Sequence, residues 1–104
     1  MAKKRTLNIG RQIEVWSGVT PPKVGGHPMT VGTLLLQMIP MLPGGENYMR
    51  FWNIGLEIDK AIGAGQDTIQ LSDLDWKMLK GAVLAGDREV WVKANLENAF
   101  VEGD

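Results

Sequence analysis

His27 is the residue of this chain best suited to catalysis, because a histidine can exchange protons near neutral pH and the sequence has no other. As the base of a nucleophilic pair, it would need a serine held beside it. The available serines are Ser17, in the same loop region, and Ser72, which is better explained as a helix cap. Because His27 lies between Gly26 and Pro28, we expect a loop residue that faces solvent. The sequence therefore predicts a protein that is not an enzyme.

The acidic residues also lack the spacing that chemistry would require. With no cysteine and a single histidine, only carboxylates remain as metal ligands, and none follows the alternating pattern of a calcium loop. Asp73 and Asp75 are two positions apart on a predicted helix, so they do not share a face. The stretch GAGQDT, residues 63–68, is similar to a glycine-rich phosphate loop, but it follows a helix instead of preceding one. We expect neither a metal nor a cofactor.

The charge balance limits the classes of partner. The net charge is −1, which argues against nucleic acid, because a domain that binds a phosphate backbone needs a surplus of Lys and Arg. The one basic cluster is Lys3, Lys4 and Arg5. We expect residues 1–5 to form a basic flexible tail ahead of a single globular domain, residues 6–104. The alternative is that this cluster is an arm that touches an anion.

Hydrophobic periodicity predicts the elements of that domain. Apolar residues alternate over 6–16, which is typical of a half-buried strand, and a proline- and glycine-rich loop follows over 17–28. Apolar residues at helical spacing then predict four helices, over 29–40, 46–65, 72–86 and 88–102. The sequence therefore predicts an α+β fold, with a short N-terminal strand or hairpin followed by about four helices around a single core.

Local signals mark where these helices begin. Thr30 and Ser72 are predicted N-caps, and Asp75 is placed to complete a capping box with Ser72. Asp87 is the predicted cap of the last helix. On the predicted helix over 46–65, the longest of the four, the side expected to face the core contains Tyr48, Phe51, Trp52, Gly55, Ile58, Asp59 and Ile62, with Ile54 and Ala61 at its border.

Four tryptophans are the compositional outlier. A chain of 104 residues can hardly bury four indole rings completely, although each lies in or beside an apolar stripe. We expect most of them in the core and one or two at a subunit interface or against a ligand, where tryptophan is enriched. This surplus, with six methionines, predicts a homo-oligomer. For a ligand site, the best candidates are Trp16, Lys23 and His27 around the 17–28 loop, with Lys3, Lys4 and Arg5 adding positive charge.

The order of the segments MTVGTLLLQMIPML, RFWNIGLEIDKA and IQLSDLDWKMLKGAV resembles small accessory proteins encoded by tailed phages and prophages. The resemblance covers residues 29–85 and transfers no catalytic residue. It implies a phage protein that acts by binding, either as a structural or assembly component of the virion or as an inhibitor or sponge. The latter would bind a host defence protein or a signalling nucleotide.

The same observations lead to expectations about the partners and the location of the protein. We expect the chain to bind itself and another phage or host protein, with a small anionic ligand as an open alternative. No apolar run is long enough for a membrane span, and no apolar stretch follows the N-terminal charges as it would in a signal peptide. We therefore expect the host cytoplasm or the virion as its location, with no membrane partner.

Overall fold

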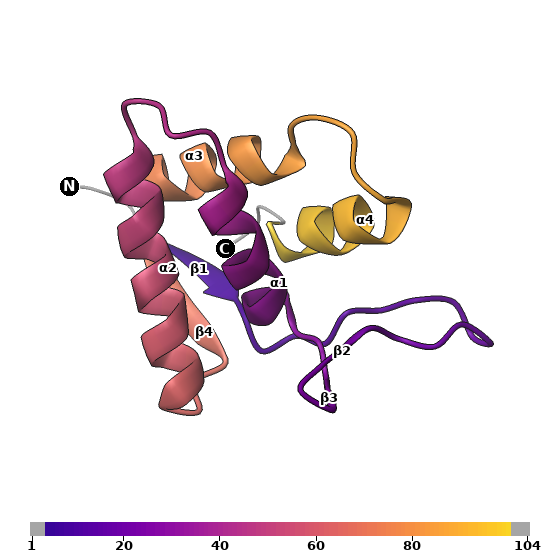
Figure 1. The fold of residues 1–104 in the computed structure, drawn as a ribbon. Coiled ribbons are helices and arrows are strands. Elements are labelled where there is room, and N and C mark those ends of the chain that lie inside the picture. The colour runs from indigo at the N-terminus through magenta and orange to yellow at the C-terminus, as the bar shows by residue number, and fades with distance from the viewer. Residues whose placement is uncertain (1–3, 101–104) are drawn as a thin grey trace.

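The computed structural model describes residues 4–100 as an α+β fold with two small antiparallel sheets and four α-helices (Figure 1). In chain order the elements are β1 (Lys4–Asn8), β2 (Lys23–Val24), β3 (His27–Pro28), α1 (Val31–Met38), the 3-10 turn η1 (Ile39–Met41), α2 (Tyr48–Gly63), β4 (Thr68–Ser72), α3 (Asp73–Leu84) and α4 (Val90–Ala99). The predicted fold class, a short strand followed by four helices, is confirmed.

The main sheet pairs β1 with β4, two strands that lie far apart in the sequence. Leu7 is opposite Ile69, and both side chains are buried on the face that turns toward the helices. The predicted strand over 6–16 was too long, because the ladder ends at Asn8. The chain bends at Gly10, where a Cβ atom would lie 2.5 Å from Oδ1 of Asp67.

Helix α1 begins where the sequence predicts it. The Thr30 hydroxyl accepts a hydrogen bond from the backbone N–H of Thr33, and the Thr33 hydroxyl accepts one from the backbone N–H of Thr30. This reciprocal capping box satisfies two amides that the helix itself leaves without partners. Next to it, the Gly32 backbone N–H donates to the Ile9 carbonyl at 2.9 Å, which brings α1 against the end of the sheet.

Helix α2 contacts the core with only part of the predicted inward side. Its buried residues are Ile54, Ile58 and Ala61. Ile58 belongs to the predicted stripe, whereas Ile54 and Ala61 were predicted at its border. Tyr48 and Trp52, predicted to face inward, are more than half exposed at 57% and 54%. Apolar residues occupy two sides of this helix, and periodicity alone does not choose between them.

Helices α3 and α4 differ in how they begin. The Ser72 hydroxyl caps α3 by accepting from the Asp75 backbone N–H at 3.1 Å, as predicted. The Asp75 carboxylate does not complete a capping box but accepts from the Arg50 guanidinium at 2.7 Å. At α4 the cap position is Glu89, without a side-chain hydrogen bond, so the prediction of Asp87 was wrong.

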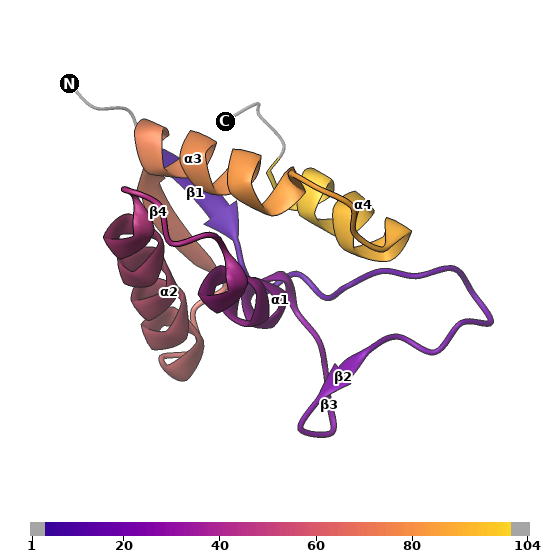
Figure 2. The same cartoon turned by 45° about the horizontal axis from the view of Figure 1, so that its top comes forward.

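The core lies where two helix pairs meet the sheet. Figure 2 shows α3 with α4 above and α1 with α2 below. The Trp76 and Phe100 rings meet edge to face in this core, with 5.6 Å between centroids. Of the tryptophans, only Trp76 is fully buried, whereas Trp91 is half-buried and Trp16 and Trp52 are exposed. Fewer indoles are in the core than the apolar stripes predict.

Candidate functional site

Residues 11–30 form an arm that projects from the body of the molecule between β1 and α1 (Figure 1). At its base the Ile13 N–H donates to the Met29 carbonyl at 3.0 Å, and the Val31 N–H donates to the Arg11 carbonyl at 2.8 Å. Ile13 and Met29 are buried, so the base is anchored in the core. Beyond the base the chain runs out to Trp16 and returns through a tight hairpin turn between β2 and β3.

That hairpin turn depends on two glycines. Gly25 and Gly26 have φ of 56° and 81°, and a turn with positive φ at both central residues matches the twist of a two-residue hairpin. The sequence placed this glycine pair within a proline- and glycine-rich loop, and the structure shows that the pair forms the turn between β2 and β3. The turn directs the chain back to Met29 and the start of α1.

Asn95 of α4 holds the outgoing segment of the arm in place. Its amide oxygen accepts from the Glu14 backbone N–H at 2.8 Å, and its amide nitrogen donates to the Glu14 carbonyl at 3.0 Å. The same nitrogen donates to the Trp91 carbonyl at 2.7 Å. The side chain therefore pairs with Glu14 as a neighbouring strand would, which fixes the arm against α4.

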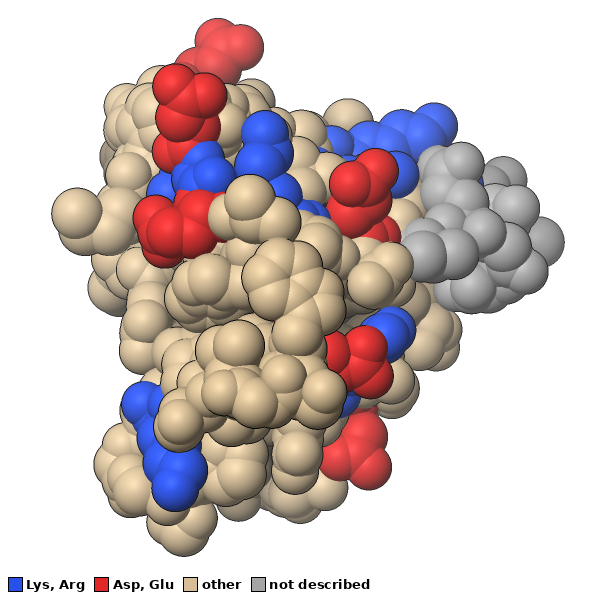
Figure 3. Space-filling model, turned by 90° about the vertical axis from the view of Figure 1, so that its right-hand side faces the viewer, with Lys and Arg blue, Asp and Glu red and all other residues tan. Residues whose placement is uncertain are grey.

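Residues of the arm and of α4 line an open groove of about 430 Å³, and we call this groove with its exposed rim the arm patch. Its exposed apolar side chains are prominent: Trp16 is 78% exposed, Val90 73% and Val19 48%. Figure 3 shows this side of the molecule, where uncharged residues cover the middle and charged residues gather toward the edges. The lining residues are Glu14, Val15, Trp16, Val19, Val90, Trp91, Ala94, Asn95 and Asn98.

The chemistry of the arm patch suits an apolar partner. Glu14 is the only charged residue that lines it, and Asn95 and Asn98 supply its polar groups. Lys23 and His27 do not line it, although both are exposed on the arm in β2 and β3. The structure thus keeps Trp16 as a binding candidate but does not bring Lys23 and His27 to the same surface.

The structure does not support a basic tail formed by the predicted cluster of Lys3, Lys4 and Arg5. Lys3 lies outside the described residues, whereas Lys4 and Arg5 belong to β1 and not to a tail. The Arg5 Nε donates to the Asp73 carboxylate at 2.8 Å, and its guanidinium lies 5.0 Å from the centroid of the Trp76 ring. Arg5 therefore joins the sheet to α3, because a cation over an indole face and a carboxylate hold it from two directions.

The Asp73 carboxyl has a clear electrostatic perturbation. Hydrogen bonds from Arg5 and then from Lys77 lower the pKa of the Asp73 carboxyl below its ordinary value, and burial opposes this effect. The Lys77 Nζ lies 3.2 Å from Oδ2 of Asp73, one helical turn away. Both cations stabilise the charged form of the carboxylate, so this cluster is an ion-pair network at the start of α3.

Sequence reasoning missed Asn95. The signal was present, because a polar residue stands directly before Leu96 within the stripe that Val92 and Leu96 define. Its two partners, however, come from the chain around Glu14 and from its own helix, and the first lies far away in the sequence. Only the fold shows that this amide organises the arm.

Among residues 4–100, no three His, Cys, Asp or Glu side chains gather as they would around a metal ion. In the same part of the chain, none of the helices combines the length and the apolar character needed to cross a membrane. No family model, curated protein or solved structure matches the sequence or the fold.

Proposed function

We propose that this chain is a non-enzymatic binding protein of a tailed phage, with a structural or assembly role in the virion, and that it binds a protein partner through the arm patch. The observation that carries the proposal is Trp16, which is 78% exposed on a projecting arm and faces a groove lined by Val90 and Trp91. Exposed apolar surface with tryptophan at its centre is typical of a protein interface. The phage setting rests on the sequence resemblance over residues 29–85.

The groove favours a protein partner over an anionic small molecule. Its volume of about 430 Å³ is large enough for a drug-sized ligand. A phosphorylated ligand, however, would meet no Lys, Arg or His in the lining, and it would lie close to Glu14. These features support a structural or assembly role ahead of a role as a sponge for a signalling nucleotide.

The test is deletion and complementation in the phage that encodes the chain. We expect deletion to reduce the yield of complete particles, as counted by electron microscopy, in hosts with and without defence systems. The wild-type chain should restore the yield, and Trp16→Ala should not. Leu74→Ala is the matched control, since Leu74 is 55% exposed on α3 and lines neither the arm patch nor another described groove.

Two outcomes would contradict the proposal. Normal particles from the deletion phage, with growth reduced only in hosts that carry a defence system, would indicate an inhibitor. Full complementation by Trp16→Ala would show that particle formation does not require the arm patch. Thermal unfolding of the variant identifies a folding defect, which we do not expect because exposed substitutions change stability by only about 0.5 kcal/mol.

A further inference from the structure

We propose that copies of this chain associate head to tail, with the end of the arm, residues 16–22, of one copy seated in an apolar groove beside α1 and α2 of the next. The inference rests on the proposed binding role of the arm patch and identifies one partner of that patch as a second copy of the chain. Three features of the structure lead to it: an unfilled groove, its position and its charge.

The receiving surface, which we call the α1–α2 groove, consists of two adjoining hollows of about 360 and 180 Å³. Its lining comes from α2, from η1 and the two residues that follow Met41, and from Leu36 at the end of α1. Ile39, Pro40 and Trp52 line both hollows and make the groove continuous. The remaining lining is almost entirely apolar: Leu36, Leu42, Pro43, Tyr48, Met49, Phe51, Gly55, Leu56 and Asp59.

The fold leaves this groove unfilled. Helix α2 uses Ile54, Ile58 and Ala61 to contact the core, and its second apolar side remains at the surface. There Trp52 is 54% exposed and Leu56 is 48% exposed. Burial of a large apolar side chain is favourable, so contact with a partner at these residues would stabilise an association.

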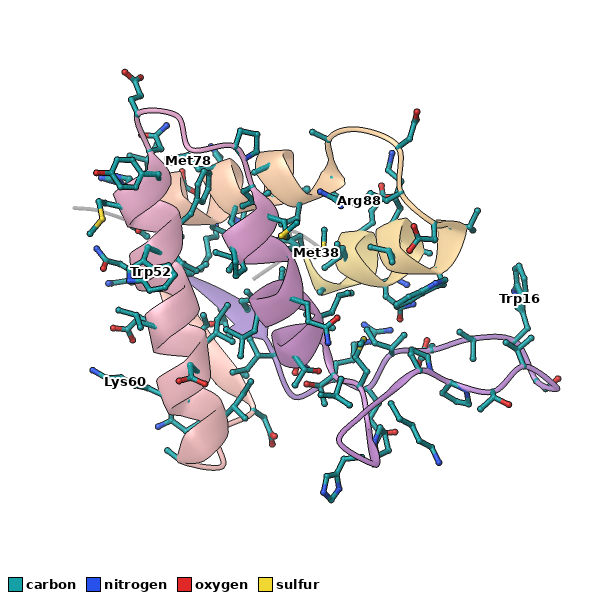
Figure 4. The ribbon with its side chains drawn as sticks, viewed as in Figure 1. Trp16, Met38, Trp52, Lys60, Met78 and Arg88 are labelled. Carbon is teal, nitrogen blue, oxygen red and sulfur yellow. The ribbon has the colours of Figure 1, made fainter. Side chains whose placement is uncertain are left out.

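The two apolar surfaces lie at opposite sides of the molecule. Figure 4 shows Trp16 at the end of the arm and Trp52 on α2, on the far side of the body. The arm therefore cannot fill the α1–α2 groove of its own chain. Contact between unlike surfaces of two copies is heterologous, and it produces a ring or an open filament instead of a two-fold dimer.

The distribution of charge matches the arm to this groove. The end of the arm, residues 16–22, has no charged residue, so it can enter an apolar hollow without desolvating an ion. Directly after it stands Lys23, and the groove has one acidic residue in its lining, Asp59. Neither has an ion-pair partner within residues 4–100, which leaves them available to each other across the contact.

The experiment is sedimentation velocity with native mass spectrometry on the full chain, over a wide range of concentration. We expect wild type to form a closed ring or a ladder of oligomers. Trp16→Ala removes the arm side chain, and Leu56→Glu places a charge in the groove. Each variant alone should be monomeric, because each keeps only one competent surface, and the dissociation constant should rise at least about 30-fold.

Mixing the two variants gives the decisive result. A Trp16→Ala chain still has its groove and a Leu56→Glu chain still has its arm, so the mixture should form a heterodimer that cannot extend. Leu74→Glu, a charge at a similarly exposed leucine of α3, is the matched control and should assemble like wild type. Trp52→Ala provides a second groove variant if Leu56→Glu fails to fold, as judged by thermal unfolding.

Three results would overturn the proposal: a wild-type monomer at every concentration, assembly that persists in both variants, or a mixture that stays monomeric. These results are separable from the proposed function. If wild type is monomeric but Trp16→Ala still abolishes particle formation, the arm binds another protein and only the present inference fails. If head-to-tail assembly occurs but Trp16→Ala complements the deletion, the proposed function fails instead.

Discussion

At the residue scale, Asp73 connects the sheet to the first turn of α3. Its carboxylate accepts hydrogen bonds from Arg5 and Lys77, which lower its pKa in the folded state. A carboxyl with a lowered folded pKa stabilises the fold above its ordinary pKa, and this contribution is lost as the pH falls through the folded value. We expect Asp73→Asn to melt at a lower temperature than wild type at pH 7, and the difference to close as the pH falls below about 4.

Thermal unfolding followed by circular dichroism from neutral to acidic pH measures this difference. Asp87→Asn is the control, because Asp87 is exposed and makes no ion pair within residues 4–100. A gap between wild type and Asp73→Asn that persists unchanged into acid would show that the carboxylate charge does not stabilise the fold.

Asn95 is the residue on which the position of the arm depends. Removing its amide in Asn95→Ala leaves the Glu14 N–H and C=O groups without their partners. We expect a loss of about 1–3 kcal/mol in the free energy of unfolding, measured by urea denaturation, because partly buried backbone groups lose their hydrogen bonds. Hydrogen exchange at the Glu14 amide should accelerate as well.

Asn98→Ala is the matched control for this prediction, since Asn98 lines the same groove and is exposed. Asn95→Asp sharpens the test. Its carboxylate can still accept from the Glu14 N–H but cannot donate to the Glu14 or Trp91 carbonyls, so it should not recover wild-type stability. A stable Asn95→Asp protein would show that the donor half of the contact is unimportant.

At the element scale, two helical glycines should respond in opposite ways to alanine. A Cβ at Gly32 would lie 3.0 Å from the Ile9 carbonyl oxygen, which the Gly32 N–H itself holds in place. At Gly55 the nearest atom is Cγ2 of Ile39 at 3.7 Å, an ordinary contact. We expect Gly32→Ala to lose about 1–2 kcal/mol through overpacking and Gly55→Ala to gain about 0.5–1 kcal/mol through helix propensity.

Urea denaturation of the two variants beside wild type checks both signs. The surroundings of Gly55 leave room for a side chain, so close backbone packing does not require a glycine at this position. Destabilisation by Gly55→Ala would show that α1 and α2 lie closer together than the structure has them.

What the sequence could predict at this scale depends on how local each signal is. The caps at Thr30 and Ser72 were predictable because donor and acceptor lie within one helical turn. The pairing of β1 with β4 was not, since α1 and α2 lie between the two strands in the sequence. The core side of α2 was predictable only in part, because both of its sides are apolar.

The candidate site follows the same rule. Trp16 could be selected from the sequence because it directly precedes a proline- and glycine-rich loop, and binding residues often lie on loops. Its neighbours in the arm patch, Val90 and Trp91, come from the last helix and were not associated with it. The sequence therefore identified one residue of the surface but not the surface.

At the scale of the whole molecule, stability and association should be linked. A contact made only by folded chains raises the melting temperature as the protein concentration increases, by mass action. If arms dock between copies, wild type should show this dependence, and a double variant, Trp16→Ser with Val19→Ser, should not. Both residues are exposed, at 78% and 48%, so the variant keeps the core of the monomer intact.

Differential scanning calorimetry across a dilution series measures both chains. At the lowest concentration the two melting temperatures should converge, because the monomers differ only at the surface. At the highest concentration wild type should melt at the higher temperature. A difference in melting temperature that is the same at every concentration would show that Trp16 and Val19 stabilise the monomer itself. A concentration dependence shared by both chains would move the contact between copies to a surface other than the arm.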